Sequence, residues 1–270
     1  MRNLVAAVSL VCAAGAAPCG AVETIVRVMT YNIHHAEGSD GKVDVARIAD
    51  VIRTADADVV CLQEVDRHLG RTGGVDMPSV LARMLDMQVA FEPNLEFDGG
   101  EYGNATLSRH LIVRHENYRL PGREGAEPRG CLRTVLRVNE VEVEVLNTHL
   151  GLDGAERQKQ AAAILTYVRD VPTVLAGDVN EDVRGPAVTA LLARFSDAAR
   201  EDAHPRYHTF PAAAPDRRID FVLVSALLDV LSSRVFSAET AAVASDHLPF
   251  VADLRLPGVR RRGLLPGRLK

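Results

Sequence analysis

The chain has 270 residues, enough to bury the core of one large domain or two small ones, and its 47% hydrophobic and 25% charged residues are ordinary for a soluble globular protein. Tryptophan is absent and aromatic residues make up only 4%, which disfavours a surface that stacks against sugars or nucleobases. The net charge is −5, and residues 260–270 hold five basic residues and no acidic one. The rest of the chain is therefore more acidic still, and a poor electrostatic partner for a polyanion such as DNA.

Residues 1–21 have the pattern of an export signal. Arg2 is their only charged residue, the apolar stretch over residues 4–17 is too short to span a bilayer, and small residues follow as far as Ala21. We therefore expect a signal peptide over residues 1–21 and a secreted or periplasmic protein; the alternative is an N-terminal anchor that stays in the membrane. No later run is long and apolar enough to span a membrane, so we expect no transmembrane segment in the mature chain.

The remainder predicts one catalytic domain over residues 22–256, followed by a basic tail over residues 257–270. Short β-branched or apolar runs predict strands, and apolar residues at helical spacing predict helices. Mixed sheets with helices outside them indicate a layered α/β sandwich. The predicted strands are residues 25–33, 58–65, 104–107, 110–113, 132–138, 141–148, 173–176, 219–224 and 250–254, and the predicted helices are residues 43–54, 78–86, 155–168 and 186–195.

Two cysteines remain in the predicted domain, Cys61 and Cys131, because Cys12 and Cys19 leave with the signal peptide. Two cysteines make no disulfide framework, and Cys61 lies within an apolar run. We expect two buried thiols.

Polar side chains recur where the predicted strands end, which is where ligands collect in α/β sheets. Asp178 and Asn180 are two residues apart, so in extended backbone their side chains point to the same side. The alternating valines of residues 141–145 share a strand face with His149, so the core-facing surface leads to this histidine. Glu64 follows another apolar strand in the same way. The pattern predicts one polar site at a common rim.

The predicted site offers oxygen and amide ligands, which suit a hard cation such as Mg²⁺, with Mn²⁺ or Ca²⁺ as alternatives. Zinc is disfavoured because the histidines lack His-x-x-x-His spacing and no cysteine pair is present. Carboxylates and histidines beside such a cation are what phosphoester hydrolysis requires. The metal neutralises charge in the transition state, a base activates water, and a cationic donor stabilises the non-bridging oxygens.

Seven motifs, in order along the chain, resemble those of the endonuclease/exonuclease/phosphatase superfamily, which includes pancreatic-type deoxyribonuclease, abasic-site endonucleases, neutral sphingomyelinases and inositol-polyphosphate 5-phosphatases. The resemblance spans residues 26–254 and implies a four-layer α/β sandwich, in which two packed mixed β-sheets are flanked by helices. It also implies direct attack of water on phosphorus. The motifs are Thr-Tyr-Asn-Ile (30–33), Leu-Gln-Glu-Val (62–65), Tyr-Gly-Asn-Ala-Thr-Leu-Ser-Arg (102–109), Asn-Thr-His-Leu (147–150), Gly-Asp-Val-Asn (177–180), Arg-Ile-Asp-Phe (218–221) and Ser-Asp-His-Leu-Pro (245–249).

The resemblance implies which residues meet the metal and the phosphate. Glu64 resembles the principal metal ligand of the family, with Asn32 beside it. Asp246 resembles a further carboxylate on the metal side. His149 resembles the histidine that donates a hydrogen bond to the scissile phosphate.

The resemblance also implies the residues that handle water. Asp178 and Asn180 resemble the pair that orients or activates water and contacts the phosphate. His247 resembles the closing histidine, held by Asp220 in a histidine–carboxylate dyad. Either Asp178 or the dyad could take the proton from water, and the histidine at position 149 favours the dyad.

Several other positions give weaker signals. Tyr102 could contact the substrate or simply pack, and His34 and His35 could line the cleft or lie exposed in a loop. Arg109 is more typical of a structural ion pair, and the arginines at positions 217 and 218 could meet a phosphate or balance acidic neighbours.

The substrate class stays open at this point. The loop over residues 38–44 resembles that of small bacterial-type members, a subgroup similar to the hydrolase-like domain of GPI-anchor lipid remodelling proteins. A phospholipid or sphingomyelin-type head group is thus as credible as nucleic acid, and the acidic body predicts no stable nucleic-acid complex. The remote alternative is a non-catalytic binding module on the same fold. We expect a monomer.

Overall fold

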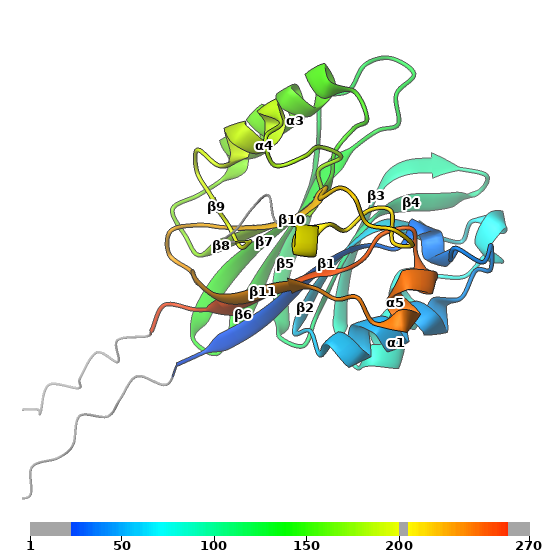
Figure 1. Cartoon of the computed structure of the whole chain (residues 1–270), viewed down its shortest axis with the longest axis horizontal. Helices are drawn as coiled ribbons and strands as arrows, with labels where there is room; N and C mark the ends of the chain where they lie inside the picture. The colour runs from blue at the N-terminus through cyan, green and yellow to red at the C-terminus, as the bar shows by residue number, and fades with distance from the viewer. Residues whose placement is uncertain (1–22, 200–204, 259–270) are drawn as a thin grey trace, which may run out of the picture.

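Two six-stranded β-sheets form the centre of the protein in the computed structural model, which describes residues 23–199 and 205–258 (Figure 1). In order across the first sheet, the strands are β11 (Asp229–Val235), β12 (Phe250–Arg255), β1 (Ile25–Asn32), β2 (Val59–Arg67), β4 (Gly100–Ser108) and β3 (Gln88–Phe97). Across the second sheet they are β5 (Leu111–Arg119), β6 (Gly130–Val138), β7 (Val141–His149), β8 (Thr173–Asp178), β10 (Asp220–Val224) and β9 (Ser196–Asp197).

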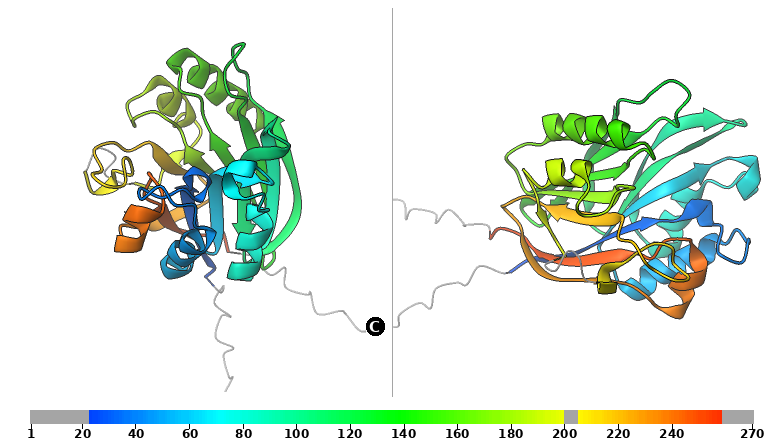
Figure 2. Two further views of the ribbon diagram at one scale, coloured as in Figure 1. Left: turned by 90° about the vertical axis from the view of Figure 1, so that its right-hand side faces the viewer. Right: turned by 45° about the horizontal axis from the view of Figure 1, so that its top comes forward.

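Helices cover the outer face of each sheet, so the molecule has four layers (Figures 1 and 2). Three apolar cores separate these layers, one between the two sheets and one under each group of helices. This confirms the four-layer α/β sandwich that the sequence predicts. The first sheet carries α1 (Val45–Ala55), α2 (Met77–Leu85) and α5 (Glu239–Ala244), and the second carries α3 (Gly154–Tyr167) and α4 (Pro186–Leu191). One-turn 3-10 helices lie at η1 (His34–Ala36), η2 (Gly70–Thr72) and η3 (Pro205–Tyr207).

The longer helices begin at aspartates that cap their free backbone N–H groups. The Asp44 side chain accepts a hydrogen bond from the backbone N of Arg47 at 3.0 Å, at the start of α1. Asp153 accepts one from the backbone N of Glu156, also at 3.0 Å, at the start of α3. Such caps fix where a helix starts and stabilise it by about 1 kcal/mol each.

Strand β2 is buried on both faces, as its near-continuous apolar run predicts. The side chains of Val59 and Cys61 lie in the core between the sheets, whereas those of Val60 and Leu62 lie under the helices of the first sheet. The two faces follow from the two-residue period of a strand. The order of residues along β2 therefore determines which side chains pack between the two sheets.

Among the described strands, each sheet has one parallel pair, β1 with β2 and β7 with β8. A buried amide pair joins the carboxyl ends of these pairs. The side chain of Asn147 accepts a hydrogen bond from Nε2 of Gln63 at 2.8 Å and donates to the carbonyl oxygens of Leu62 and Ala105 at 3.1 and 2.9 Å. These bonds fix the position of one sheet edge against the other.

All predicted strands and helices are present, but the sequence pattern missed β3, β9, β11 and α5. Strand β3 contains Pro93 and polar residues and has a bulge between Pro93 and Leu95. It lies at the edge of its sheet, where such residues are tolerated because half of the backbone faces away from a partner. Strand β11 also forms an edge and is half exposed, so it lacks a strong apolar pattern.

Both ends of the described domain leave the same side of the molecule (Figure 1). Strands β1 and β12 are antiparallel neighbours, with Ile25 paired to Arg255. The site at the far end of β1, beyond Asn32, lies at the opposite end of this strand pair.

Some predictions concern residues that the structure does not describe. The predicted signal peptide and residues 259–270 of the predicted basic tail lie outside the described residues. Within the described residues, no helix is long and apolar enough to cross a membrane. Cys61 and Cys131 are free and buried, as expected.

Candidate active site

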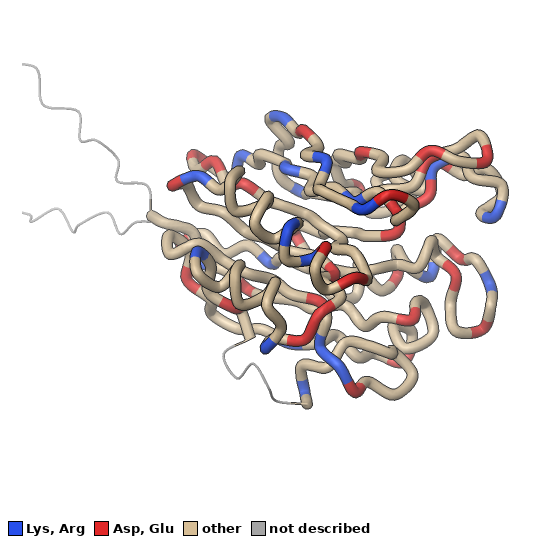
Figure 3. Tube along the Cα trace, turned by 90° about the horizontal axis from the view of Figure 1, so that it is seen from above, with Lys and Arg blue, Asp and Glu red and all other residues tan. Residues whose placement is uncertain are grey.

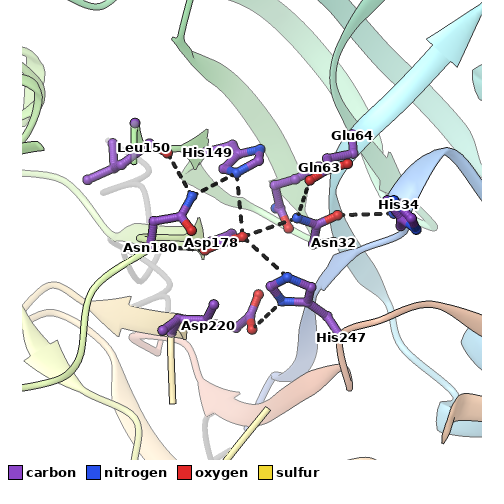
Figure 4. A network of polar contacts seen from close by, with 12 residues as sticks. Asn32, His34, Gln63, Glu64, His149, Leu150, Asp178, Asn180, Asp220 and His247 are labelled. Carbon is purple, nitrogen blue, oxygen red and sulfur yellow. Dashed lines mark hydrogen bonds and ion pairs between the residues drawn. The ribbon is translucent and has the colours of Figure 1, made fainter. Parts of the chain in front are cut away.

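A pocket of about 400 Å³ opens beyond the carboxyl ends of the parallel strand pairs and collects residues from both sheets. Its lining includes six of the eight predicted site residues. The other two are buried and hydrogen-bonded to residues of the lining (Figure 4). The sequence-predicted residues therefore come together. The six lining residues are Glu64, His149, Asp178, Asn180, Asp246 and His247, and the two behind are Asn32 and Asp220.

Asn32, at the end of β1, links carboxylates from the two sheets. Its side-chain N–H groups donate to Oε1 of Glu64 at 2.9 Å and to Oδ2 of Asp178 at 3.1 Å. Its side-chain oxygen accepts from the backbone N of His34 at 3.0 Å. Two carboxylates thus approach one neutral amide, whose N–H groups donate to both of them.

Glu64 reaches the pocket because β2 bulges. The register against β4 shifts between Leu62 and Val65, and Glu64 takes a left-handed φ of 58°. Alternation along a regular strand would instead place Glu64 on the helix-covered face with Leu62. The sequence identified the residue, but the bulge rather than the simple strand period directs its carboxylate.

Asp178 ends β8 and lies between two imidazoles. Its Oδ2 is 3.5 Å from Nε2 of His149 and 3.6 Å from Nε2 of His247 (Figure 4). Its Oδ1 accepts from the backbone N of Asn180 at 2.8 Å, which holds the turn after the strand. Burial, reinforced by the nearby charge of Asp220, raises the pKa of Asp178 to about 7.

The preceding glycine allows β8 to lie close against β7. Gly177 has a φ of 154°, and a β-carbon there would collide with the carbonyl oxygen of Thr148. Any other residue would push Asp178 away from its partners on β7.

His247 and Asp220 form the predicted dyad. Nδ1 of His247 lies 2.9 Å from Oδ2 of Asp220, and both side chains are almost fully buried. Burial alone would lower the pKa of His247, but the carboxylates of Asp220, Asp178 and Asp246 outweigh it and raise this pKa to about 10. The dyad therefore holds a protonated imidazole at neutral pH.

His149 is held differently, by an arginine that the sequence analysis did not single out. Nη1 of Arg129 lies 3.0 Å from Nδ1 of His149. On the other side of the ring, Nδ2 of Asn180, which also donates to the carbonyl oxygen of Leu150, lies 3.0 Å from Nε2 of His149. Burial, together with the charges of Arg129 and His247, holds the pKa of His149 well below its usual value. The imidazole is therefore neutral at pH 7, and its Nε2 is the nitrogen that faces Asp178.

Arg129 is one of several pocket residues outside the predicted set. Arg71 and Glu127 also line the pocket, and burial is the main cause of the raised pKa of Glu127. None of the three lies in a recognised motif, so only their spatial position reveals them. Apolar side chains complete the pocket wall, namely Leu95, Phe97, Leu152 and Phe210.

Some of the weaker candidates line the pocket, and others lie outside it. Tyr102, His34 and His35 line the pocket, so the cleft-lining alternative holds for the two histidines. Arg109 forms ion pairs with Asp56 and Asp58 at 2.9 and 3.3 Å, which is the structural role that the sequence favoured.

The two neighbouring arginines bind other parts of the molecule. Arg218 is buried and forms two hydrogen bonds with Asp197, at 2.6 and 2.7 Å. Arg217 lies over the ring of Phe210 and beside Asp216. Neither lines the pocket.

The donor set fits a divalent cation. Glu64 and Asp178 converge on Asn32, Asp246 adds a third carboxylate to the pocket wall, and the buried Oδ1 of Asp220 has no hydrogen-bond partner among the described residues. Oxygen ligands of this kind suit hard divalent ions. Two groups of three residues each bring their possible ligand atoms within 4.8 Å of one another. One group is Asp178, Asp220 and His247, and the other is His34, His35 and Glu64.

Comparison with known proteins agrees with these motifs. The model of the Endonuclease/Exonuclease/phosphatase family matches residues 29–247. The chain belongs to this family. Members of the family hydrolyse phosphoester bonds and typically depend on a divalent metal.

Similar proteins match over most of the chain. YbhP of Escherichia coli (strain K12) is 32% identical over 246 residues, which cover 85% of this chain and 96% of that protein. The crystal structure of an endonuclease/exonuclease/phosphatase from Beutenbergia cavernae DSM 12333 is 33% identical, with a TM-score of 0.73, over 87% of this chain and 72% of that one. The mannosyl-6-phosphatase Bt3783 of Bacteroides thetaiotaomicron is 19% identical, with a TM-score of 0.66, over 85% and 99% of the two chains, and shares the fold.

Proposed function

We propose that this chain is a divalent-metal-dependent hydrolase of phosphoester bonds, in which water attacks phosphorus directly. The observation that carries this proposal is the position of Asp178 between the imidazoles of His149 and His247, at 3.5 and 3.6 Å, in a pocket that also contains Glu64 and Asp246. A divalent cation bound at Glu64 and Asp246 supplies positive charge that offsets the charge developing on the phosphate in the transition state.

The chain's own residues bind and orient the phosphate. His149 directs its neutral Nε2 toward Asp178, and His247 presents an imidazolium held by Asp220. Both imidazoles face the same part of the pocket, where they bind the non-bridging oxygens and stabilise the charge on them. Preorganised donors of this kind typically contribute about 10²–10³-fold each to turnover.

We propose that Asp178, rather than the dyad that the sequence favours, accepts the proton from the attacking water. His247 is surrounded by three carboxylates that favour its protonated form, which makes it a better donor than acceptor. Asp178 has a raised pKa, and its Oδ2 faces the site because it lies between the two imidazoles, whereas Oδ1 accepts from the backbone N of Asn180.

The substrate that we propose is a small phosphoester with an apolar group beside the phosphate, such as a phospholipid head-group linkage. Phe97 and Leu152 line the pocket and are 38% and 76% exposed, so apolar surface is available next to the polar floor. Basic and acidic residues are interspersed along the described chain (Figure 3), which does not favour stable binding of nucleic acid. The mannosyl-6-phosphatase of similar fold makes a phosphomonoester the competing outcome.

Hydrolysis of bis-p-nitrophenyl phosphate and of p-nitrophenyl phosphate, with Mg²⁺, Mn²⁺ or EDTA, tests the proposal. We expect turnover that EDTA abolishes and that His247→Ala reduces by at least 10²-fold. His115→Ala, on the far strand β5, is the matched control. Absence of turnover of either ester with every metal would contradict the proposal and favour a binding module.

A second assay separates the substrates. We expect faster hydrolysis of a lysophospholipid than of plasmid DNA or RNA, and Leu152→Asp is expected to lower the lipid rate by raising KM. Equal loss of the p-nitrophenyl phosphate rate in this variant would show damage to the polar site instead. Faster cleavage of nucleic acid would overturn the substrate assignment.

We also propose that the protein is exported and monomeric. Residues 1–21 support export through their single charge, apolar centre and small residues. Recovery of the processed chain outside the cytoplasm, and its elution as a single copy, are the results expected; an uncleaved cytoplasmic chain would contradict export.

A further inference from the structure

Two pocket histidines, His34 and His35, have no part in the proposed reaction. They lie in η1, directly after the Asn32 motif, and line the pocket together with Glu64. One ligand atom of each of the three lies within 4.8 Å of the other two. Ligand atoms that share a metal lie about 2.0–2.2 Å from it and hence roughly 3–4 Å apart, so a small inward movement completes the set.

Glu37 holds both imidazoles in forms that leave one ring nitrogen free. Nδ1 of His34 lies 3.2 Å from the carbonyl oxygen of Glu37, and because a carbonyl only accepts, Nδ1 carries the proton and Nε2 has a lone pair. Nε2 of His35 lies 3.3 Å from the carboxylate of Glu37, and its Nδ1 is buried with no hydrogen-bond partner. Each ring thus keeps one nitrogen for a ligand, as metal-binding histidines do when an acceptor orients the other nitrogen.

Glu64, from strand β2, completes the set. The bulge in β2 turns its carboxylate into the pocket, and Asn32 holds one of its oxygens at 2.9 Å. The three side chains come from two adjacent segments, the turn after β1 and the bulge of β2, so the fold itself keeps them together. Two imidazoles and one carboxylate suit a transition metal, whereas Mg²⁺ prefers oxygen ligands.

We propose that His34, His35 and Glu64 bind a divalent transition-metal ion, so that the metal of the active site has nitrogen as well as oxygen ligands. The inference rests on the proposed function only in that Glu64 belongs to both. It makes Mn²⁺ or Zn²⁺, rather than Mg²⁺, the ion that the full chain selects.

Pulsed electron paramagnetic resonance of Mn²⁺ bound to the full chain tests this directly, because coupling to ¹⁴N reports an imidazole ligand. A variant with both His149→Gln and His247→Gln serves as the parent, since it removes the two other pocket imidazoles, which lie 3.5 and 3.6 Å from Oδ2 of Asp178. We expect ¹⁴N coupling in this parent and its loss when His34→Gln and His35→Gln are added. His115→Gln in the same parent is the control and keeps the coupling.

Glu37→Ala provides a second variant that leaves all three ligands in place. It removes the carboxylate that orients His35, whereas the backbone carbonyl that holds His34 remains. We expect Mn²⁺ affinity, measured by calorimetry, to fall about tenfold while Mg²⁺ affinity changes less. Glu37→Ala tests the proposal by itself if the variant that lacks His34 and His35 fails to fold, as judged by circular dichroism.

The inference is overturned if the parent shows no ¹⁴N coupling, if the coupling survives loss of His34 and His35, or if Glu37→Ala leaves Mn²⁺ affinity unchanged. All of these measurements are made without substrate. A chain with nitrogen-ligated Mn²⁺ but no phosphoester turnover would contradict only the proposed function, and an active chain without nitrogen coupling would contradict only this inference.

Discussion

The side-chain amide of Asn32, at the end of β1, donates a hydrogen bond to Oδ2 of Asp178, at the end of β8, across 3.1 Å. The same amide donates to Glu64 at 2.9 Å. One neutral group therefore bridges two carboxylates that belong to different sheets. This arrangement stabilises the metal-free pocket while keeping its acidic groups close enough to share a cation.

Asn32→Asp is expected to destabilise the metal-free protein. The substitution replaces a donor by a third carboxylate, so the free energy of unfolding at pH 8 should fall by about 2 kcal/mol or more. The new buried carboxyl has a raised pKa, so the variant protein loses stability as pH rises above the unfolded pKa of about 4. The difference in stability from the parent should therefore shrink toward pH 4. Urea unfolding in EDTA at the two pH values measures this, and an equal loss at both would contradict it.

Asp220→Asn is expected to lower the pKa of His247. In the parent, carboxylate neighbours outweigh burial and raise this pKa to about 10, and the closest of them is removed. The pairing stabilises the fold fully below the unfolded pKa of about 6.5 and is lost as pH rises toward 10, so the variant should lose stability mainly at neutral and acidic pH. NMR titration of the imidazole nitrogens in metal-free protein measures the pKa.

Signals of His115 provide the internal reference in that titration, because this residue lies on β5, far along the other sheet. A His247 pKa that stays near 10 in Asp220→Asn would show that other carboxylates hold the proton.

Glu64→Gln is expected to raise the metal concentration needed for half-maximal turnover by about 10–100-fold, because a carboxylate ligand becomes a weaker amide. Glu96→Gln is the matched control, since Glu96 is an exposed residue of β3 between the pocket residues Leu95 and Phe97. Metal titration of the p-nitrophenyl phosphate assay measures both. An unchanged requirement in Glu64→Gln would remove this residue from the metal site.

Asn147→Ala is expected to destabilise the fold by about 3 kcal/mol or more. It removes the buried donor to the carbonyl oxygens of Leu62 and Ala105, and the acceptor that lies 2.8 Å from Nε2 of Gln63. Asn139→Gly, at an exposed turn with a φ of 53°, should change stability by less than about 0.5 kcal/mol. Chemical denaturation of the two variants compares them, and equal effects would show that the buried amide pair adds nothing.

Much of the fold could be predicted because its strands carry strong apolar patterns. β2 is the clearest example, because it is buried on both faces as far as Gln63. Edge strands carry weaker patterns, since half of their backbone lies against no partner, and β3 and β11 were missed for that reason.

The site was predictable where a motif marks it and not elsewhere. The eight predicted residues come together, but Arg129 belongs to no recognised motif and reaches His149 only through the pairing of β6 with β7. The direction of the Glu64 side chain depends on a one-residue bulge, which apolar periodicity does not encode. Side-chain protonation likewise depends on neighbours from distant segments.

The pairing of Ile25 with Arg255 has a practical consequence for how the protein can be handled. Both ends of the domain emerge from one side, and the length of β1 separates them from Asn32, about 25 Å at the usual strand rise. A bead, vesicle or fused carrier attached at either end would leave the mouth of the pocket facing solution. Substrates presented on a second surface could then approach it unhindered.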